Sequence, residues 1–310
     1  MEYVVYGSSS KQVSRLGFGG WQLGSDATWG EMSQEDGVAL VQAALRRGIR
    51  FFDTAPGYSF GRSETILGLA MADDREAVVI NSKFGHNADG TSDFSVEAIE
   101  PSIRSSLKRL KTTYLDSVLL HNPEMAILSG KTGHFDKLDE LRERGLIRAF
   151  GVSCDTEEEV KAVLATHRVQ VIELLFNVFF QAPRECFDEI AKQGIALIVK
   201  VPLDSGWLTG KYRANAVFSG VRSRWSKEQI ARRAGLVEEL SAIAKSNDLT
   251  PLALGFIASF PAVTTIIPGI KSVTQLEGLI FAIDQPFSNH LQATLTRFYD
   301  ERIANDPLWW

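Results

Sequence analysis

The chain has 310 residues, of which 45% are hydrophobic and 23% are charged, and its formal net charge at neutral pH is −5. This composition is typical of a soluble globular protein, and the acidic balance excludes a basic face for nucleic acid, so we expect a small-molecule partner. The two cysteines are too few for a disulfide framework, and the start of the chain lacks a signal peptide. No apolar run approaches the roughly 20 residues of a membrane span. Together these features predict a cytoplasmic protein without membrane contact.

Short apolar runs recur along the chain, and each is followed by a segment with the spacing of an amphipathic helix. We expect strands over residues 13–18, 49–53, 78–83, 115–121, 147–153, 169–176, 195–201 and 264–268. Beyond a first helix that begins near residue 33, we expect helices over residues 64–71, 96–110, 131–144, 157–166, 184–193, 228–245 and 273–283. An additional helix over 252–258 is expected before the last strand.

The first expected helix shows start and stop signals clearly. Ser33, with Asp36 three residues later, forms a start that resembles a capping box. Val41 and Leu45 share one face of this helix, and Gly48 can end it.

The alternation of strand and helix predicts the fold class. Because parallel strands need crossover connections and closure removes both sheet edges, we expect an α/β protein in which residues 1–310 form a single (β/α)₈ TIM barrel domain. An open doubly wound sheet is the alternative. The segment GFGGWQLG, residues 17–24, lacks the glycine spacing of a dinucleotide-binding fingerprint, and no helix follows it promptly, so the barrel is preferred.

Polar side chains stand at the ends of three consecutive expected strands, where a barrel of this kind gathers its catalytic groups. The segment FFDTAPGYSFGRSE, residues 51–64, ends a strand with Asp53 and places Tyr58 in the turn that follows. The next strand ends in VVINSKFG with Lys83, and the one after it ends in LDSVLLHNPE with His121. We expect these four side chains to converge.

An acid, a phenol, an amine and an imidazole are suited to delivering a proton to a carbonyl group. The pKa of a free tyrosine is about 10, and a nearby ammonium typically lowers it by roughly 1–3 units. We expect Lys83 to act in this way on Tyr58, Asp53 to keep Lys83 protonated, and His121 to align the carbonyl. Each residue taken singly also has a purely structural explanation, as a loop aromatic for Tyr58, a cap or turn residue for Asp53, a solvent-facing lysine for Lys83 and a turn residue for His121. The prediction of a catalytic site therefore rests on the four residues occurring together.

These segments, together with LGFGGWQLG, IRAFGVSC, VPLDSGWLTGKY and TTIIPGIKS, resemble the aldo-keto reductase superfamily over most of the chain. The resemblance maps the family's catalytic tetrad onto Asp53, Tyr58, Lys83 and His121. It implies a (β/α)₈ barrel and reversible hydride transfer between a nicotinamide dinucleotide and a small aldehyde, ketone or alcohol, with Tyr58 as the general acid.

The resemblance also implies which residues lie along the cofactor. They are Gly20, Trp21, Ser153, Cys154, Glu173, Lys200, Pro202, Leu203, Ser205, Leu208, Lys271, Ser272 and Gln275. Lys271 and Ser272 are placed to hold a 2′-phosphate, which favours NADPH over NADH. Gln275 stands where the family frequently has arginine, so we expect a modest preference, with NADH as the alternative cofactor.

Three of these positions depart from the family pattern at the nicotinamide end. Cys154 replaces the usual asparagine, Glu173 a common glutamine, and Lys200 an aromatic residue that commonly stacks on the ring. Because Glu173 and Lys200 end neighbouring strands, which lie only about 4.8 Å apart, we expect them to form an ion pair within about 4 Å. Without the stacking ring, we expect the nicotinamide to be held more loosely than the adenosine phosphate end.

The substrate pocket is less well specified by the sequence. Trp21, Phe84, Trp207 and Trp309 are expected to form apolar walls, with Trp310 as an alternative to Trp309. Apolar walls of this kind do not identify a substrate, and the sequence indicates neither the reaction direction nor the oligomeric state.

Other functional classes are alternatives to carbonyl reduction. A nucleotide-sensing regulatory subunit with little turnover is the main alternative, because some proteins of the superfamily have that role and keep the tetrad. A glycoside hydrolase using Asp53 and Glu173 would need their carboxyl groups roughly 5–9.5 Å apart, and Lys83 beside Asp53 argues against it. The five histidines show no close ligand spacing, so no metal is expected.

Overall fold

The computed structural model describes residues 1–25 and 29–310. Within these ranges, eight parallel strands form one sheet, in which each strand pairs with the next along the chain from β3 to β10. The strands are β3 (Phe18–Gly19), β4 (Phe51–Asp53), β5 (Val79–Phe84), β6 (Leu115–His121), β7 (Ile147–Cys154), β8 (Val171–Leu175), β9 (Ala196–Lys200) and β10 (Val263–Ile266).

Backbone contacts between the two edges of this sheet close it into a barrel. The Gly17 N–H donates to the carbonyl of Ile266 at 2.8 Å, and the Gly19 N–H donates to Pro268 at 3.0 Å. Parallel bridges also join Leu16 to Ile266 and Gly19 to Gly269. The expected (β/α)₈ barrel is therefore confirmed.

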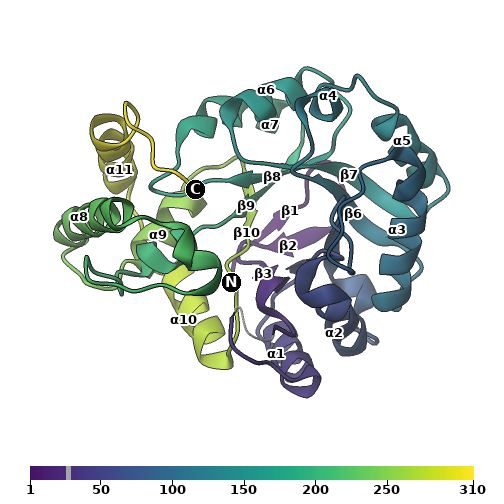
Figure 1. Ribbon diagram of the computed structural model, residues 1–310, viewed down its shortest axis with the longest axis horizontal. Coiled ribbons are helices and arrows are strands. Elements are labelled where there is room, and N and C mark those ends of the chain that lie inside the picture. Colours follow the sequence, from purple (N-terminus) through teal and green to yellow (C-terminus); the bar gives the residue numbers. More distant parts are fainter. Residues whose placement is uncertain (26–28) are drawn as a thin grey trace.

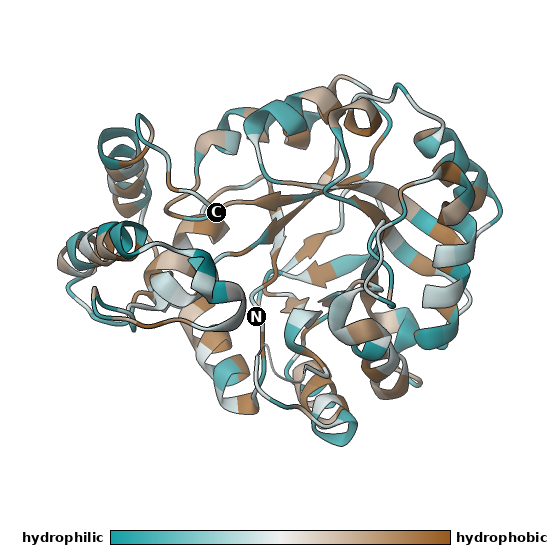
Figure 2. Cartoon of the chain, viewed as in Figure 1, coloured by the Kyte–Doolittle hydropathy of each residue, from teal (hydrophilic) through white to brown (hydrophobic). Residues whose placement is uncertain are grey.

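Helices surround the strands (Figure 1), and Figure 2 shows that the strands are hydrophobic whereas the outer faces of the helices are mixed or hydrophilic. The helices that follow the strands are α1 (Gln34–Arg46), α2 (Arg62–Ala70), α3 (Val96–Arg109), α5 (His134–Glu143), α6 (Glu157–Leu164), α7 (Phe187–Lys192), α9 (Thr250–Ala258) and α10 (Val273–Ile283). Two further helices, α8 (Lys227–Ala244) and α11 (Asn289–Arg302), lie beside each other outside the ring and are joined by an ion pair between Arg302 and Glu239 at 2.6 Å. A short helix, α4 (Met125–Leu128), follows β6.

The local signals of the first helix act as expected. Ser33 Oγ accepts a hydrogen bond from the Asp36 backbone N–H at 3.0 Å at the start of α1. Gly48 follows the helix with φ of 88°, a backbone conformation that glycine adopts without strain.

The apolar run over 13–18 does not form one strand, which corrects the expectation. β2 (Gln12–Ser14) pairs antiparallel with β1 (Tyr3–Val5), and the first barrel strand begins only at Phe18. The first part of the run belongs to a hairpin that packs against the barrel interior, where Val13 and Tyr6 join a buried cluster with Phe51. The helix expected over 184–193 is also shorter, since a 3₁₀ turn, Ala182–Cys186, precedes α7.

The barrel interior has an apolar layer below a polar one. The apolar layer is the inner cluster of Tyr6, Val13, Phe51, Val79, Leu119, Val171, Ala196, Ile198 and Ile267. Because side chains alternate between the two faces of a strand, the residues two positions further along β4, β5, β8 and β9 also point inward. That position is occupied by Asp53, Asn81, Glu173 and Lys200, so the polar layer faces the C-terminal end of the barrel.

In the part of the chain that the structure describes, none of the helices is both long enough and apolar enough to span a membrane.

Candidate active site

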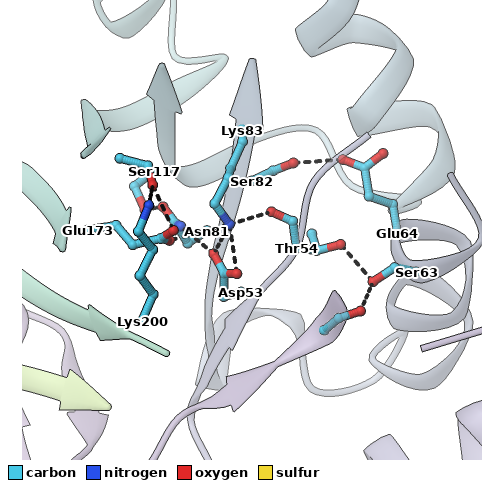
Figure 3. A network of polar contacts seen from close by, with 12 residues as sticks. Asp53, Thr54, Ser63, Glu64, Asn81, Ser82, Lys83, Ser117, Glu173 and Lys200 are labelled. Atoms are coloured by element: carbon cyan, nitrogen blue, oxygen red, sulfur yellow. Dashed lines mark hydrogen bonds and ion pairs between the residues drawn. The ribbon is translucent and has the colours of Figure 1, made fainter. Parts of the chain in front are cut away.

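The four candidate catalytic side chains are brought together at the C-terminal end of β4, β5 and β6. Lys83 Nζ donates to the two carboxylate oxygens of Asp53 at 2.6 and 2.7 Å and to the Thr54 carbonyl at 3.2 Å (Figure 3). The same nitrogen lies 5.0 Å from the centre of the Tyr58 ring. The rings of Tyr58 and His121 meet edge to face, 6.1 Å apart.

Burial sets the protonation states of these groups. Burial raises the pKa of the Tyr58 phenol, and the charge of Lys83 opposes this only in part, so the phenol keeps its proton at neutral pH. The lowered tyrosine pKa expected from the sequence is therefore corrected, because the loss of water around the phenol outweighs the effect of the ammonium. Burial, followed by the charge of Lys83, holds the pKa of His121 well below its usual value, so its imidazole is neutral.

Lys83 remains charged despite being fully buried. Burial alone would lower its pKa, but the charges of Asp53 and Glu173 outweigh that effect and raise it. The ammonium is therefore a permanent positive charge beside Tyr58.

A string of hydrogen bonds runs down the barrel interior from Asp53. Asn81 Nδ2 donates to Asp53 Oδ1 at 2.7 Å, and Ser117 Oγ donates to Asn81 Oδ1 at 2.6 Å (Figure 3). The hydroxyl groups of Ser117 and Tyr6 are 2.7 Å apart. We call Tyr6, Ser117, Asn81 and Asp53 the axial string. It fixes the Asp53 carboxylate from below while Lys83 holds it from the side.

The expected ion pair between Glu173 and Lys200 is wrong. Among the described residues, Lys200 Nζ pairs instead with Asp155 at 2.8 Å and donates to Asn122 Oδ1 at 3.0 Å, whereas Glu173 Oε2 lies 3.3 Å from Lys83 Nζ. Ser153 bridges the two residues, accepting from Lys200 Nζ at 2.8 Å and donating to Glu173 Oε1 at 2.9 Å. A buried carboxylate gains more from a fully buried cation than from the partly exposed Lys200, because attraction is stronger where water is excluded.

The segment after β9 has an irregular backbone. Val201, Asp204 and Ser205 have φ of 54°, 43° and 53°, values that side chains other than glycine rarely adopt. The side chains of Arg222 and Arg224 hold this segment from outside: Arg222 Nε donates to the Ser205 carbonyl at 2.9 Å, and Arg224 donates to Ser205 Oγ at 3.2 Å.

The N-terminus of α10 lies at the far end of this region. Ser272 Oγ accepts from the Gln275 N–H at 3.2 Å, and Gln275 Oε1 accepts from the Lys271 N–H at 3.0 Å. Lys271 is exposed, and its Nζ lies 3.4 Å from the Trp29 carbonyl. A lysine beside an exposed helix N-terminus is suited to binding a phosphate group.

Residues 15–300 match the Aldo/keto reductase family model. The chain belongs to the aldo/keto reductase family. It is 29% identical to aldo-keto reductase YhdN of Bacillus subtilis (strain 168), over 99% of this chain and 96% of that protein. It is 27% identical to NADH-specific methylglyoxal reductase of Escherichia coli (strain K12), over 98% of this chain and 99% of that protein. The holo structure of aldo-keto reductase AKR11C1 from Bacillus halodurans, 23% identical, matches with a TM-score of 0.80 over 96% of both chains and supports the fold.

As an aldo/keto reductase, the protein is a nicotinamide-nucleotide-dependent oxidoreductase. Its barrel mouth offers a fit for such a cofactor. Glu173 Oε2 contacts Lys83 but is buried without an aligned hydrogen-bond donor in the described part of the chain, and His121 Nδ1 has no hydrogen-bond partner there. A polar ligand at the mouth can therefore form hydrogen bonds with these two atoms.

The expected cofactor residues of this aldo/keto reductase occupy different surroundings. Leu203 and Ser205 are partly buried beside the irregular segment, whereas Pro202 and Leu208 are buried. Cys154 points away from the mouth, because it follows the inward Ser153 on β7 and is packed in the outer hydrophobic core.

Gly20 is required by close packing. A Cβ added to it would lie 2.5 Å from the Asp53 carbonyl, and the Ser63 hydroxyl donates to the Gly20 carbonyl at 2.8 Å. The residue after it, Trp21, is 43% exposed, and its ring centre lies 6.2 Å from that of Tyr58.

Two of the four expected pocket walls do not face the mouth, which corrects that expectation. Phe84 has no exposed surface and packs against Phe94 on the helix side of β5, since it follows the inward Lys83. Trp207 is also fully buried, in an aromatic group with Tyr212, Phe218 and Trp225. Trp21 and Trp309 are exposed.

Several residues near the site were missed from the sequence. Asn81 and Ser117 stand at even spacing before Lys83 and His121, so the period of the strands could have found them. Asp155 lies just past the end of β7. Trp29, which packs on Trp21 at 5.1 Å and under the Arg222 guanidinium at 4.8 Å, carried no local signal.

Proposed function

We propose that this aldo/keto reductase reduces small aldehydes or ketones to alcohols, with NADPH as the preferred cofactor and Tyr58 as the general acid. The observation that carries the proposal is the buried cluster in which Lys83, held by Asp53, lies 5.0 Å from the centre of the Tyr58 ring, which meets the His121 ring edge to face at 6.1 Å. Carbonyl reduction needs an acid, a group that stabilises the conjugate base of that acid, and a hydrogen-bond donor for the carbonyl.

Each side chain has a separate role in the proposed reaction. The neutral imidazole of His121 donates a hydrogen bond to the substrate carbonyl oxygen and orients it toward Tyr58. The Tyr58 O–H gives its proton to that oxygen as negative charge develops on it. The Lys83 ammonium then stabilises the phenolate, and Asp53 keeps the ammonium in place through bonds of 2.6 and 2.7 Å. The same steps in reverse oxidise an alcohol.

The bound cofactor would supply the hydride, and the chain would supply its position. Ser153, Glu173 and Lys200 are assigned to the nicotinamide end, next to Tyr58. The irregular segment from Pro202 to Leu208 is assigned to the pyrophosphate. Lys271, Ser272 and Gln275 are assigned to the adenosine phosphate.

The first test measures turnover and the acid together. The wild-type protein should oxidise NADPH, followed by its absorbance, when a generic aldehyde such as 4-nitrobenzaldehyde is added. Tyr58→Phe should lower kcat by on the order of 10²–10⁴-fold while NADPH binding, measured by fluorescence, stays nearly unchanged. A variant that kept more than about a tenth of the wild-type kcat would contradict the role of Tyr58. A wild-type protein that bound NADPH without turnover would favour the nucleotide-sensing alternative.

The second test concerns the choice of cofactor. Lys271 offers a charge-assisted contact for the 2′-phosphate, which NADH lacks. Lys271→Ala should weaken kcat/KM for NADPH by about tenfold, as expected from the loss of one hydrogen bond to a charged group, and should leave the value for NADH unchanged. Equal values for both cofactors in the wild type, unaffected by this substitution, would remove the basis for the NADPH preference.

A further inference from the structure

A single ammonium lies between two carboxyl groups at the base of the active site. Lys83 Nζ is 2.6 Å from Asp53 and 3.3 Å from Glu173 Oε2, and the exposed fractions of the three side chains are 0%, 3% and 2%. In Figure 3, Glu173 and Thr54 lie on opposite sides of Asp53 and the Lys83 nitrogen. One positive charge therefore faces two potential negative charges where water is excluded.

The contacts of Glu173 indicate that a proton is held between the two carboxyls. Glu173 Oε1 accepts from Ser153 at 2.9 Å, but no donor in the described part of the chain is aligned with Oε2. Both carboxyl groups contact the same ammonium, and two like charges held so close together where water is excluded do not readily ionise together, so one carboxyl keeps its proton. Burial and then the charge of Glu173 raise the pKa of Asp53 to about 7. The favoured state at lower pH is a protonated Asp53 beside an ionised Glu173.

The other charged groups around Lys83 do not take over this role. Lys200 is already neutralised by Asp155 at 2.8 Å, and His121 is neutral. Tyr6, below the site, is a phenol whose pKa burial raises further above its usual value. The titratable groups around the carboxyl pair are Tyr58 after β4, Lys83 on β5, His121 on β6, Lys200 on β9 and Tyr6 after β1.

We propose that Asp53 and Glu173 share one proton at Lys83, and that loss of this proton weakens Tyr58 as an acid, so that Glu173 sets the alkaline limit of carbonyl reduction. With the proton in place, Lys83 and the two carboxyls are together neutral, and the ammonium can stabilise the phenolate. When the proton passes to solvent, both carboxylates are ionised and the group carries one net negative charge. That charge opposes phenolate formation, because the negative charges of Asp53 and Glu173 raise the pKa of Tyr58.

The inference rests on the proposed function, in which Tyr58 is the acid, and it is tested by the pH profile of the hydride-transfer step. In wild-type protein, the single-turnover rate of NADPH oxidation by saturating aldehyde should fall as pH rises through about 7. In Glu173→Gln, which keeps the length of the side chain and its contact with Ser153, the midpoint should move upward by at least about 1 pH unit. A structural role alone for Glu173 would lower the rate equally at all pH values.

Asp155→Asn is the matched control. It removes a carboxylate from the same mouth, but one that pairs with Lys200 and not with Lys83. Whatever its rate, its midpoint should stay at the wild-type pH. Equal midpoints in wild type and Glu173→Gln, or an equal shift in Asp155→Asn, would overturn the proposal.

Infrared spectroscopy of the protein without cofactor gives a readout that does not depend on turnover. Wild-type protein should show a carboxylic acid C=O band that disappears with a midpoint near pH 7 and is missing from both Glu173→Gln and Asp53→Asn. Asp204, whose pKa burial also raises, should contribute equally to wild type and Glu173→Gln. Absence of a titrating band between about pH 6 and 8 in the wild type would overturn the proposal even if the variants failed to fold. An inactive wild type that still showed the band would refute the proposed function and leave the carboxyl pair standing.

Discussion

The two sides of the barrel mouth hold their charges in different ways. On the tetrad side, formed by Asp53, Tyr58, Lys83 and His121, the ammonium is fully buried and fixed by one carboxylate within 2.7 Å. On the relay side, formed by Ser153, Asp155, Glu173 and Lys200, the ammonium is partly exposed and divided among several acceptors. Glu173 belongs to the relay side by its strand and to the tetrad side by its charge. Burial, more than proximity along the sheet, decides which ions pair.

The largest expected difference between the two sides comes from removing each lysine. Lys83→Met should lower kcat by on the order of 10²–10⁴-fold, because the phenolate loses its stabilising charge. Lys200→Met should lower kcat by less than about tenfold, because Lys200 contacts neither Tyr58 nor Lys83 and its pair with Asp155 is partly open to solvent, which weakens it. Steady-state kinetics with one aldehyde and NADPH measures both effects. Similar losses in the two variants would show that the relay side takes part in the chemistry.

The next largest expected effect distinguishes an aromatic residue that packs in the core from one that contacts substrate, both on the tetrad side. Phe84→Ala should reduce the free energy of unfolding by about 3–5 kcal/mol, since a large ring leaves a cavity in the outer core, and should leave KM nearly unchanged. Trp21→Ala is the matched comparison: the ring is exposed beside Tyr58, so KM should change while stability stays within about 0.5 kcal/mol. Chemical denaturation and kinetics of both variants provide the measurement. A raised KM for Phe84→Ala with little loss of stability would restore Phe84 as a pocket wall.

The smallest effect concerns stability as a function of pH. The pKa of Asp53 is raised to about 7 in the folded protein. Between the pKa of Asp53 in the unfolded chain and pH 7, the folded state therefore binds more protons than the unfolded state. The free energy of unfolding then falls as pH rises through this range. In Glu173→Gln this fall should be smaller by about 1.4 kcal/mol, the equivalent of one pKa unit. The pKa of Glu173 itself is lowered in the folded state, so its contribution is constant above its unfolded value.

Urea unfolding of wild type and Glu173→Gln between about pH 5 and 8 measures this difference. The neutral His121 makes folding less favourable at acidic pH in both proteins, and subtraction removes its contribution. A difference in stability that did not change with pH would argue that Glu173 leaves the titration of Asp53 unaltered.

The sequence was informative where a residue's role follows from local spacing. The strand ends at Asp53, Lys83 and His121 were found because apolar runs end there, and the start of α1 because Ser33 and Asp36 have capping spacing. The antiparallel hairpin of β1 and β2 was missed, because residues 13–18 carry no signal that shows where one strand ends and the next begins. The helix α11 was missed as well.

The errors at the site have a common physical origin. Spacing places Glu173 and Lys200 on adjacent strands, but the choice of partner depends on burial, which only the closed barrel determines. The outward direction of the Phe84 side chain follows from the alternation of side chains along β5, because Lys83 before it points inward. Phe84 was predicted as a pocket wall only from its position near the end of the strand. The pKa of Tyr58 depends on how much water the fold removes, and no motif reports that.

The axial string has a consequence for protein engineering. Loops at the mouth of such barrels are commonly redesigned on the assumption that the opposite end contributes only to stability. Here Tyr6, which follows the hairpin strand at the far end, reaches Asp53 of the proposed tetrad through Ser117 and Asn81. A library that varies the hairpin for thermostability would therefore also sample catalytic variants, and grafting this mouth onto another barrel would need the three interior polar residues to be transplanted with it.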